Sequence, residues 1–283
     1  MGIDYAGPTT SDVHILANST ESLFSGPLTS YKLPLSFLLR VQLSPGDTID
    51  FAVGFGANSN YFYDGSAIAV QIVHTDVTCT AQAPPECIPG TNCFNAVKDF
   101  SITSNPNGVW QYGWTASLGS EFNLYGDTDS ASVPGMSAWL AEGTFSNPPS
   151  LAHNDTPGAV CWLAICDPPT FLYSHPGAID QYTVLRWVAP AAGVYRVRAV
   201  FMGLDHATPV TTDVHVLVNS TKSLFSGPIT STDLPLDVFL NAQASAGDTV
   251  DFAVGFGADG NYNSDSTGIA VQIVQTNVVC APQ

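Results

Sequence analysis

The chain has 283 residues, of which 24 are acidic and 7 are basic, so its formal net charge is -17. This balance excludes binding to nucleic acid or to an anionic membrane surface, because both require clustered lysine and arginine. Apolar residues make up 45% of the sequence, enough for a folded core, and no apolar run is long enough to insert into a membrane.

An internal repeat organises the chain. Residues 1–79 align without gaps with residues 202–280 at a constant offset of 201, and about 50 of the 79 aligned positions are identical. Residues 98–201 precede only the second of these stretches. We call residues 98–201 the front half, and the two aligned stretches the first and second rear halves. The repeat predicts one complete unit at 98–280 and an additional rear half at 1–79.

The alignment also bears on the N-terminus. Met1 aligns with Met202, which lies in a predicted strand, so the chain begins in the middle of a repeat unit. The first residues contain neither the basic nor the apolar region of a signal peptide. We therefore expect a front half and a signal peptide upstream of Met1; the alternative is that the chain naturally starts there.

A linker rich in proline and cysteine, residues 80–97, joins the two units. The chain contains six cysteines in all, namely Cys79, Cys87, Cys93, Cys161, Cys166 and Cys280. Their spacing does not match the paired ligands of zinc sites, so disulfides are favoured over a metal, although 15 pairings remain open. Disulfides indicate an oxidising compartment, and the chain is expected to be secreted or on the cell surface.

The rest of the chain consists of short runs that alternate between apolar and polar residues. In chain order, strands are predicted at 184–188, 194–200, 212–218, 236–242, 249–254 and 269–274. Turns rich in glycine and proline separate them, and no long segment has a helical period. This spacing predicts an all-β, jelly-roll-like antiparallel β-sandwich. A lone rear half would expose an apolar sheet face and unpaired edges, so it must pack against something.

Aromatic residues are the candidate ligand-binding positions. They are Trp110, Tyr112, Trp114, Tyr61, Tyr63 and Tyr262. The first three alternate along one predicted strand and would share a face on which sugar rings can stack. The last three lie in loops rich in glycine and asparagine. The alternative for the strand residues is that they pack the interior of the sandwich.

Acidic turns are the candidate metal sites. No cofactor is required by the sequence, but calcium prefers several oxygen ligands, and carboxylates two residues apart are typical. Asp127 and Asp129 have that spacing, and Asp64 and Asp265 lie in similar oxygen-rich loops. The alternative is that these carboxylates accept hydrogen bonds from the backbone of their own turns. The six histidines lack the spacing of a metal motif.

Several stretches resemble one family. They are Asn-Pro-Asn-Gly-Val-Trp-Gln-Tyr-Gly-Trp at 105–114, Tyr-Thr-Val-Leu-Arg-Trp at 182–187 and Gly-Asp-Thr-Val-Asp-Phe-Ala-Val-Gly at 247–255. Together they resemble a domain common in exported bacterial proteins, many of the PEP-CTERM sorted type. The resemblance implies an extracellular β-sandwich, and the turn at 187–195 is similar to turns in carbohydrate-binding modules. The sorting tail is missing at 281–283, so surface sorting is not carried over.

Three functions are compatible with these features. The favoured one is a non-catalytic extracellular protein that binds a polysaccharide or another cell-surface polymer. The first alternative is a structural subunit that forms a homo-oligomer, a dimer or filament, by completing a neighbour's sheet. The second is a glycan-active hydrolase using acids outside the repeat, of which Glu121, Glu142, Asp155 and Asp180 are the candidates.

Overall fold

The computed structural model describes residues 2–3, 11–28, 36–37, 41, 43–56, 62, 64–68, 70, 72, 77–78, 92–207, 210–232, 235–276 and 281–282. Every strand pair in the described residues is antiparallel, and a short 3-10 helix spans Gly257–Asp259. The all-β fold predicted from the sequence is confirmed. None of the helical structure in these ranges could cross a membrane.

One layer of the sandwich is a seven-stranded sheet. Its strands, in spatial order, are β10 (Phe122–Leu124), β9 (Trp110–Thr115), β17 (Tyr182–Val188), β22 (Thr249–Gly255), β19 (Asp213–Val218), β20 (Lys222–Pro228) and β4 (Ser36–Phe37). The front half supplies the first three strands and the second rear half the next three. The last strand, β4, comes from the first rear half.

The other layer is an eleven-stranded sheet. Its spatial order is β11 (Asp127–Asp129), β12 (Met136–Leu140), β13 (Ser150–Asn154), β16 (Leu172–His175), β23 (Thr267–Thr276), β18 (Gly193–Gly203), β21 (Leu236–Ala244), β3 (Glu21–Leu28), β2 (Ser11–Ala17) and β5 (Ile49–Gly54), with β8 (Cys93–Asn95) also paired to β23. The predicted linker thus ends in a strand. Phe94 of β8 lies against Trp187, with ring centroids 5.6 Å apart, which fixes this strand on the sheet.

Three two-stranded ribbons complete the fold. They are β1 (Gly2–Ile3) with β6 (Ser66–Ala67), β14 (Val160–Trp162) with β15 (Ile165–Asp167), and β7 (Val77–Thr78) with β24 (Ala281–Pro282). A disulfide joins Cys161 to Cys166 across the β14–β15 ribbon. Cys93 is also disulfide-bonded. For these three cysteines the disulfide prediction is confirmed; the others lie outside the described residues.

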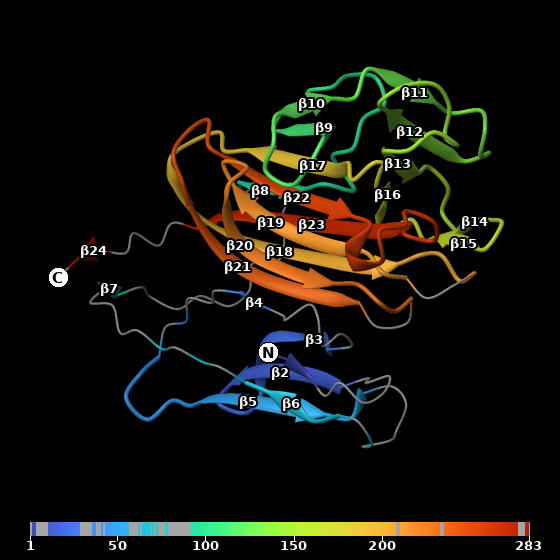
Figure 1. The fold of residues 1–283 in the computed structure, drawn as a ribbon. Helices are drawn as coiled ribbons and strands as arrows, with labels where there is room; N and C mark the ends of the chain where they lie inside the picture. The colour runs from blue at the N-terminus through green and yellow to red at the C-terminus, as the bar shows by residue number, and fades with distance from the viewer. Residues whose placement is uncertain are drawn as a thin grey trace.

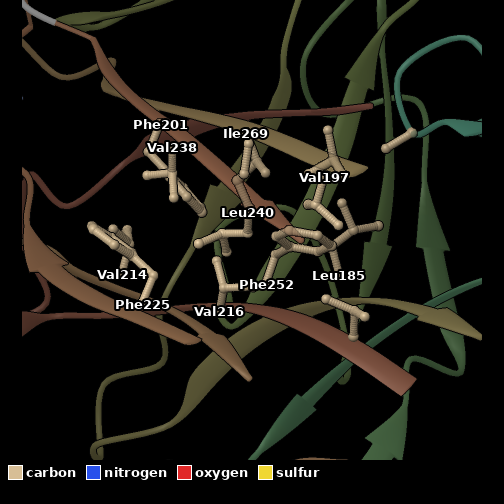
Figure 2. Packing of buried hydrophobic residues seen from close by; sticks show 14 of the residues in the cluster. Leu185, Val197, Phe201, Val214, Val216, Phe225, Val238, Leu240, Phe252 and Ile269 are labelled. Carbon is tan, nitrogen blue, oxygen red and sulfur yellow. The ribbon is translucent and has the colours of Figure 1, made fainter. Parts of the chain in front are cut away.

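The core lies between the two large sheets. Alternate residues of each strand point inward, so Tyr195, Val197 and Ala199 of β18 are fully buried while Arg198 between them is exposed. Figure 2 shows side chains of both sheets meeting in this layer, with Leu185, Val214, Val216, Phe225 and Phe252 from one sheet and Val197, Phe201, Val238, Leu240 and Ile269 from the other. Burial of each such side chain contributes about 2 kcal/mol, so this layer is the main source of stability.

The first hairpin of each rear half, β2–β3 and β19–β20, folds into the same local structure. In β2–β3, His14 lies opposite Ser25, and in β19–β20 the aligned His215 lies opposite Ser226. Both hairpins have an irregularity at the same aligned position, after Ile15 and after Val216. The similar sequences therefore direct the same strand register in both hairpins.

The two rear halves also contact one another reciprocally. β3 of the first pairs with β21 of the second, with Ser25 opposite Asp237. β20 of the second pairs with β4 of the first, with Ser226 opposite Ser36. Position 237 is aligned with position 36, and position 226 with position 25, so both pairs join the same two repeat positions. The contact between the rear halves therefore has pseudo-twofold symmetry. In Figure 1 the blue strands β2, β3 and β5 accordingly extend one sheet of the complete sandwich.

Candidate functional site

A groove of about 350 Å³ lies on the outer face of the seven-stranded sheet. One wall is the loop before β10, with Leu118 and Gly119. The floor is formed by β19, β20 and the turn between them, which contribute His215, Leu217, Ser220, Thr221, Ser223 and Ser226. Because Val214 and Val216 point into the core, the alternation of β19 directs His215 and Leu217 outward. Four hydroxyl groups, His215 and two leucines therefore line the groove.

One end of the groove contains a chain of hydrogen bonds across three residues. Nε2 of His215 lies 2.6 Å from the carboxylate of Asp213, and Nδ1 lies 2.9 Å from Oγ of Ser226. A carboxylate only accepts, so Nε2 of His215 carries a proton, and Nδ1 shares a hydrogen bond with the Ser226 hydroxyl. The Tyr182 hydroxyl and the Gly257 N–H also donate to Asp213. Burial alone would raise the pKa of Asp213, but these donors hold it below its usual value.

The other end of the groove lies over a buried ion pair. Arg186 binds both carboxylate oxygens of Asp251, at 2.6 and 2.9 Å, and also donates to Oγ of Ser220 at 2.7 Å. The guanidinium lies 3.9 Å from the centroid of the Phe122 ring. Two parallel hydrogen bonds and an aromatic contact restrict the arginine to one orientation. The floor of the groove is thus rigid before any ligand binds.

A carboxylate, a histidine and a serine in series are also the elements of a hydrolytic triad. The same series recurs in the first rear half, where His14 lies 2.7 Å from Asp12 and 3.0 Å from Ser25. In both copies the histidine and serine are direct cross-strand neighbours, and the aspartate also accepts from a loop N–H. The series therefore belongs to the framework of the repeat, and it stiffens the outer face of each hairpin.

The predicted aromatic positions have different environments. Trp110 and Tyr112 are fully buried in the core, so the stacking role predicted for them is wrong and the packing alternative holds. Trp114 is half-buried and packs against the same core. Tyr262 is half-buried, with its ring edge-on to His175 at 5.9 Å. Tyr61 and Tyr63 lie outside the described residues.

The burial of the Trp110 and Tyr112 rings has a clear cause. The indole N–H of Trp110 donates to Asp99, and the Tyr112 ring stacks near Trp139 with centroids 6.3 Å apart. Large rings at every second position fill the space between two sheets, and here their polar atoms find partners there.

Two of the predicted metal ligands accept hydrogen bonds from their own turn or from the turn after β12. Asp129 accepts hydrogen bonds from the Ser132 hydroxyl and from the backbone of Phe145, Ser132 and Ala131, and these donors hold its pKa well below the usual value. Asp127 accepts from Gly143 N–H. These contacts are the turn-capping alternative, and no three metal-ligating side chains converge anywhere in the described ranges.

The two remaining candidates lie at aligned positions in the rear halves. Asp265 is buried and accepts hydrogen bonds from Thr211 and Thr212. The Asp64 carbonyl accepts from Ser11 and Ser66. Calcium binding remains a prediction.

The groove itself was not identified from the sequence. The alignment showed that His14 and His215 are equivalent, but the partner serine lies 11 residues away in the next strand. Only the strand register brings Ser226 opposite His215. A signal did exist, because aspartate, histidine and serine are identical at all three positions in both rear halves.

Comparisons with known proteins add little beyond this geometry. No family model matches the chain, and no curated protein does. One solved structure similar to the chain is the N-terminal cellulose-binding domain of Cellulomonas fimi β-1,4-glucanase C, at 17% identity over 54% of this chain and 97% of that one, with a TM-score of 0.26. Another, described as "CBM4 structure and function", has 13% identity over 56% and 96%, with a TM-score of 0.24. Likeness at this level carries no argument about function.

Proposed function

We propose that the chain is a non-catalytic carbohydrate-binding protein, and that the groove on the outer face of the seven-stranded sheet binds a segment of neutral polysaccharide. The observation that carries this proposal is the gathering of hydroxyl groups over a floor whose charged groups are already paired. The oxygens of these hydroxyl groups can accept hydrogen bonds from sugar hydroxyls, because each oxygen has two lone pairs. Leu118 is 39% exposed and offers an apolar contact to the C–H face of a sugar ring.

The charge of the molecule indicates which polysaccharides fit. A net charge of -17 repels acidic polymers, and the cation beside the groove, Arg186, is neutralised by Asp251. Neutral glycans are therefore favoured over uronic-acid or sulfated ones. The disulfide in the β14–β15 ribbon supports an extracellular setting, where such polymers are found.

Thr221→Arg is expected to weaken polysaccharide binding about tenfold, because a long side chain would occupy the groove. Thr221 is exposed in the β19–β20 turn and its hydroxyl donates to the nearby Asn219 carbonyl, so the fold should tolerate the change. Isothermal titration against a panel of neutral and acidic polysaccharides would measure the effect.

The first rear half offers a matched control. Thr20 occupies the same position in the β2–β3 turn, with the same hydrogen bond to the Asn18 carbonyl. Thr20→Arg should leave binding unchanged. If no polysaccharide in the panel binds, or if the two variants weaken binding equally, the groove is not a carbohydrate site.

A further inference from the structure

The first rear half presents apolar side chains to solvent that are buried at the aligned positions of the second. The exposed fractions are 39% for Val53, 41% for Ile68, 48% for Val70 and 75% for Ile72, against at most 2% for the aligned Val254, Ile269, Val271 and Ile273. The residue types are the same in each pair. The difference therefore arises from what covers them.

In the second rear half the cover is the front half. β17 pairs with β22 along its whole length, from Thr183 opposite Val254 to Val188 opposite Thr249. β18 pairs with β23 in the other layer. In the first rear half β5 takes the place of β22, and β5 is the last strand of its sheet within the described residues. The seven-stranded sheet thus continues from β22 to β17, whereas the eleven-stranded sheet ends at β5 within the described residues.

Asp50 and Asp12 are aligned with the two carboxylates that bind β17 in the second rear half, so they mark where an equivalent strand would lie beside β5. In the second rear half, Asp251 receives Arg186 of β17 and Asp213 receives the hydroxyl of Tyr182, also of β17. The aligned Asp50 and Asp12 keep their local contacts.

The local contacts are the same in both rear halves. Ser19 donates to Asp50 as Ser220 does to Asp251, and Gly56 N–H donates to Asp12 as Gly257 N–H does to Asp213. Across the described ranges, however, neither Asp50 nor Asp12 receives an arginine or a tyrosine.

We infer that the open edge and apolar face of the first rear half form a docking surface for a front half of this repeat other than the one at 98–201. The incoming strand has the chemistry of β17, with a tyrosine and an arginine four residues apart. In the register seen at β22, the arginine lies opposite Asp50 and the tyrosine reaches Asp12. This is strand addition to a sheet edge, with main-chain hydrogen bonds for affinity and side chains for register.

The edge itself is unprotected against such pairing. β5 reads Ile-Asp-Phe-Ala-Val-Gly and has no proline or lysine, which natural proteins place on edge strands to prevent association. Its one charge, Asp50, is the group that selects an arginine-bearing strand. The docking surface thus favours strand pairing through the open edge of β5, and it discriminates between incoming strands through the charge of Asp50.

The test uses the full chain and a fluorescently labelled synthetic peptide of residues 180–190, which contains β17. Fluorescence anisotropy should show saturable binding at one peptide per chain. Asp50→Asn in the chain and Arg186→Leu in the peptide should each weaken binding about tenfold, and the two together should cost little more than either one. The peptide variant leaves the chain unchanged, so its effect does not depend on the folding of a mutant.

Val53→Lys serves as the location control, because Val53 belongs to β5 and the change places a charge in the apolar face of the docking surface. It should abolish peptide binding, while a scrambled peptide should bind to neither chain. Absence of binding, or binding that survives Val53→Lys, would overturn the inference. So would concentration-dependent dimers that Val53→Lys disrupts while the peptide fails to bind, since the occupant would then be the same face of a second chain.

Discussion

Replacing Asp167 by asparagine is expected to raise the free energy of unfolding at pH 8 by about 4 kcal/mol, while changing it little at pH 4. Asp167 is fully buried at the end of β15, and neither of its carboxylate oxygens has a hydrogen-bond partner in the described structure. Burial without partners disfavours the charged form and raises the pKa of this carboxyl to about 8. Urea unfolding at pH 4 to 8 measures the effect.

The direction follows from proton binding. Between the unfolded pKa of 3.8 and the folded value of about 8, the folded state holds a proton that the unfolded state has released. Stability of the natural chain therefore falls as pH rises through this window and levels off above it. Asp265, whose pKa burial raises to about 7, adds a loss of the same sign. Asparagine does not titrate, so Asp167→Asn removes the pH-dependent loss of stability that position 167 causes.

Asp129 provides the control because hydrogen bonds from Ser132, Phe145 and Ala131 shift its pKa in the opposite direction. Asp129→Asn should lower stability by the same amount at pH 6 and at pH 8, since the carboxylate is charged throughout that range. A gain from Asp167→Asn that did not depend on pH would show that Asp167 is not held neutral in the folded chain.

Phe252→Ala is expected to destabilise the chain by about 4 kcal/mol, because it leaves a cavity between the two sheets. Phe252 is fully buried and lies in the layer shown in Figure 2. The aligned Phe51→Ala should cost less than half as much. Phe51 has the same chemistry and the same position in β5, but it is only half-buried. Thermal and urea unfolding of the two variants would compare them directly.

This pair of variants tests the role of the front half. Equal losses would mean that the first rear half has a cover as complete as that of the second. A small loss at Phe51 that becomes large when the peptide of residues 180–190 is present would connect stability to the docking surface.

Much of the fold could be predicted from local sequence. The six strands expected between residues 184 and 274 are all present as β17, β18, β19, β21, β22 and β23. Strand alternation is a local property, because successive side chains point to opposite faces whatever the strand pairs with. The same applies to the equal hairpins of the two rear halves, since turn residues and cross-strand neighbours lie within about 20 positions of one another.

Which strands pair across the halves could not be predicted in this way. The union of β3 with β21 joins residues more than 200 positions apart, and it depends on two edges meeting in space. Trp110 and Tyr112 illustrate the same limit for the site. Their spacing is equally suited to an open face and to a core, and only the opposing sheet decides which of the two occurs.

The sequence by itself determined the all-β class, the repeat and the residue types that recur at each repeat position. Tertiary structure alone decided which copies of those residues are buried, which carboxylates receive an arginine, and where hydroxyl groups gather into a groove. The reason is physical: backbone preference and alternation act between near neighbours, whereas burial and pairing depend on which surface arrives from elsewhere in the chain. Val53 and Val254 are the same residue at the same repeat position, and only the strand beside them differs.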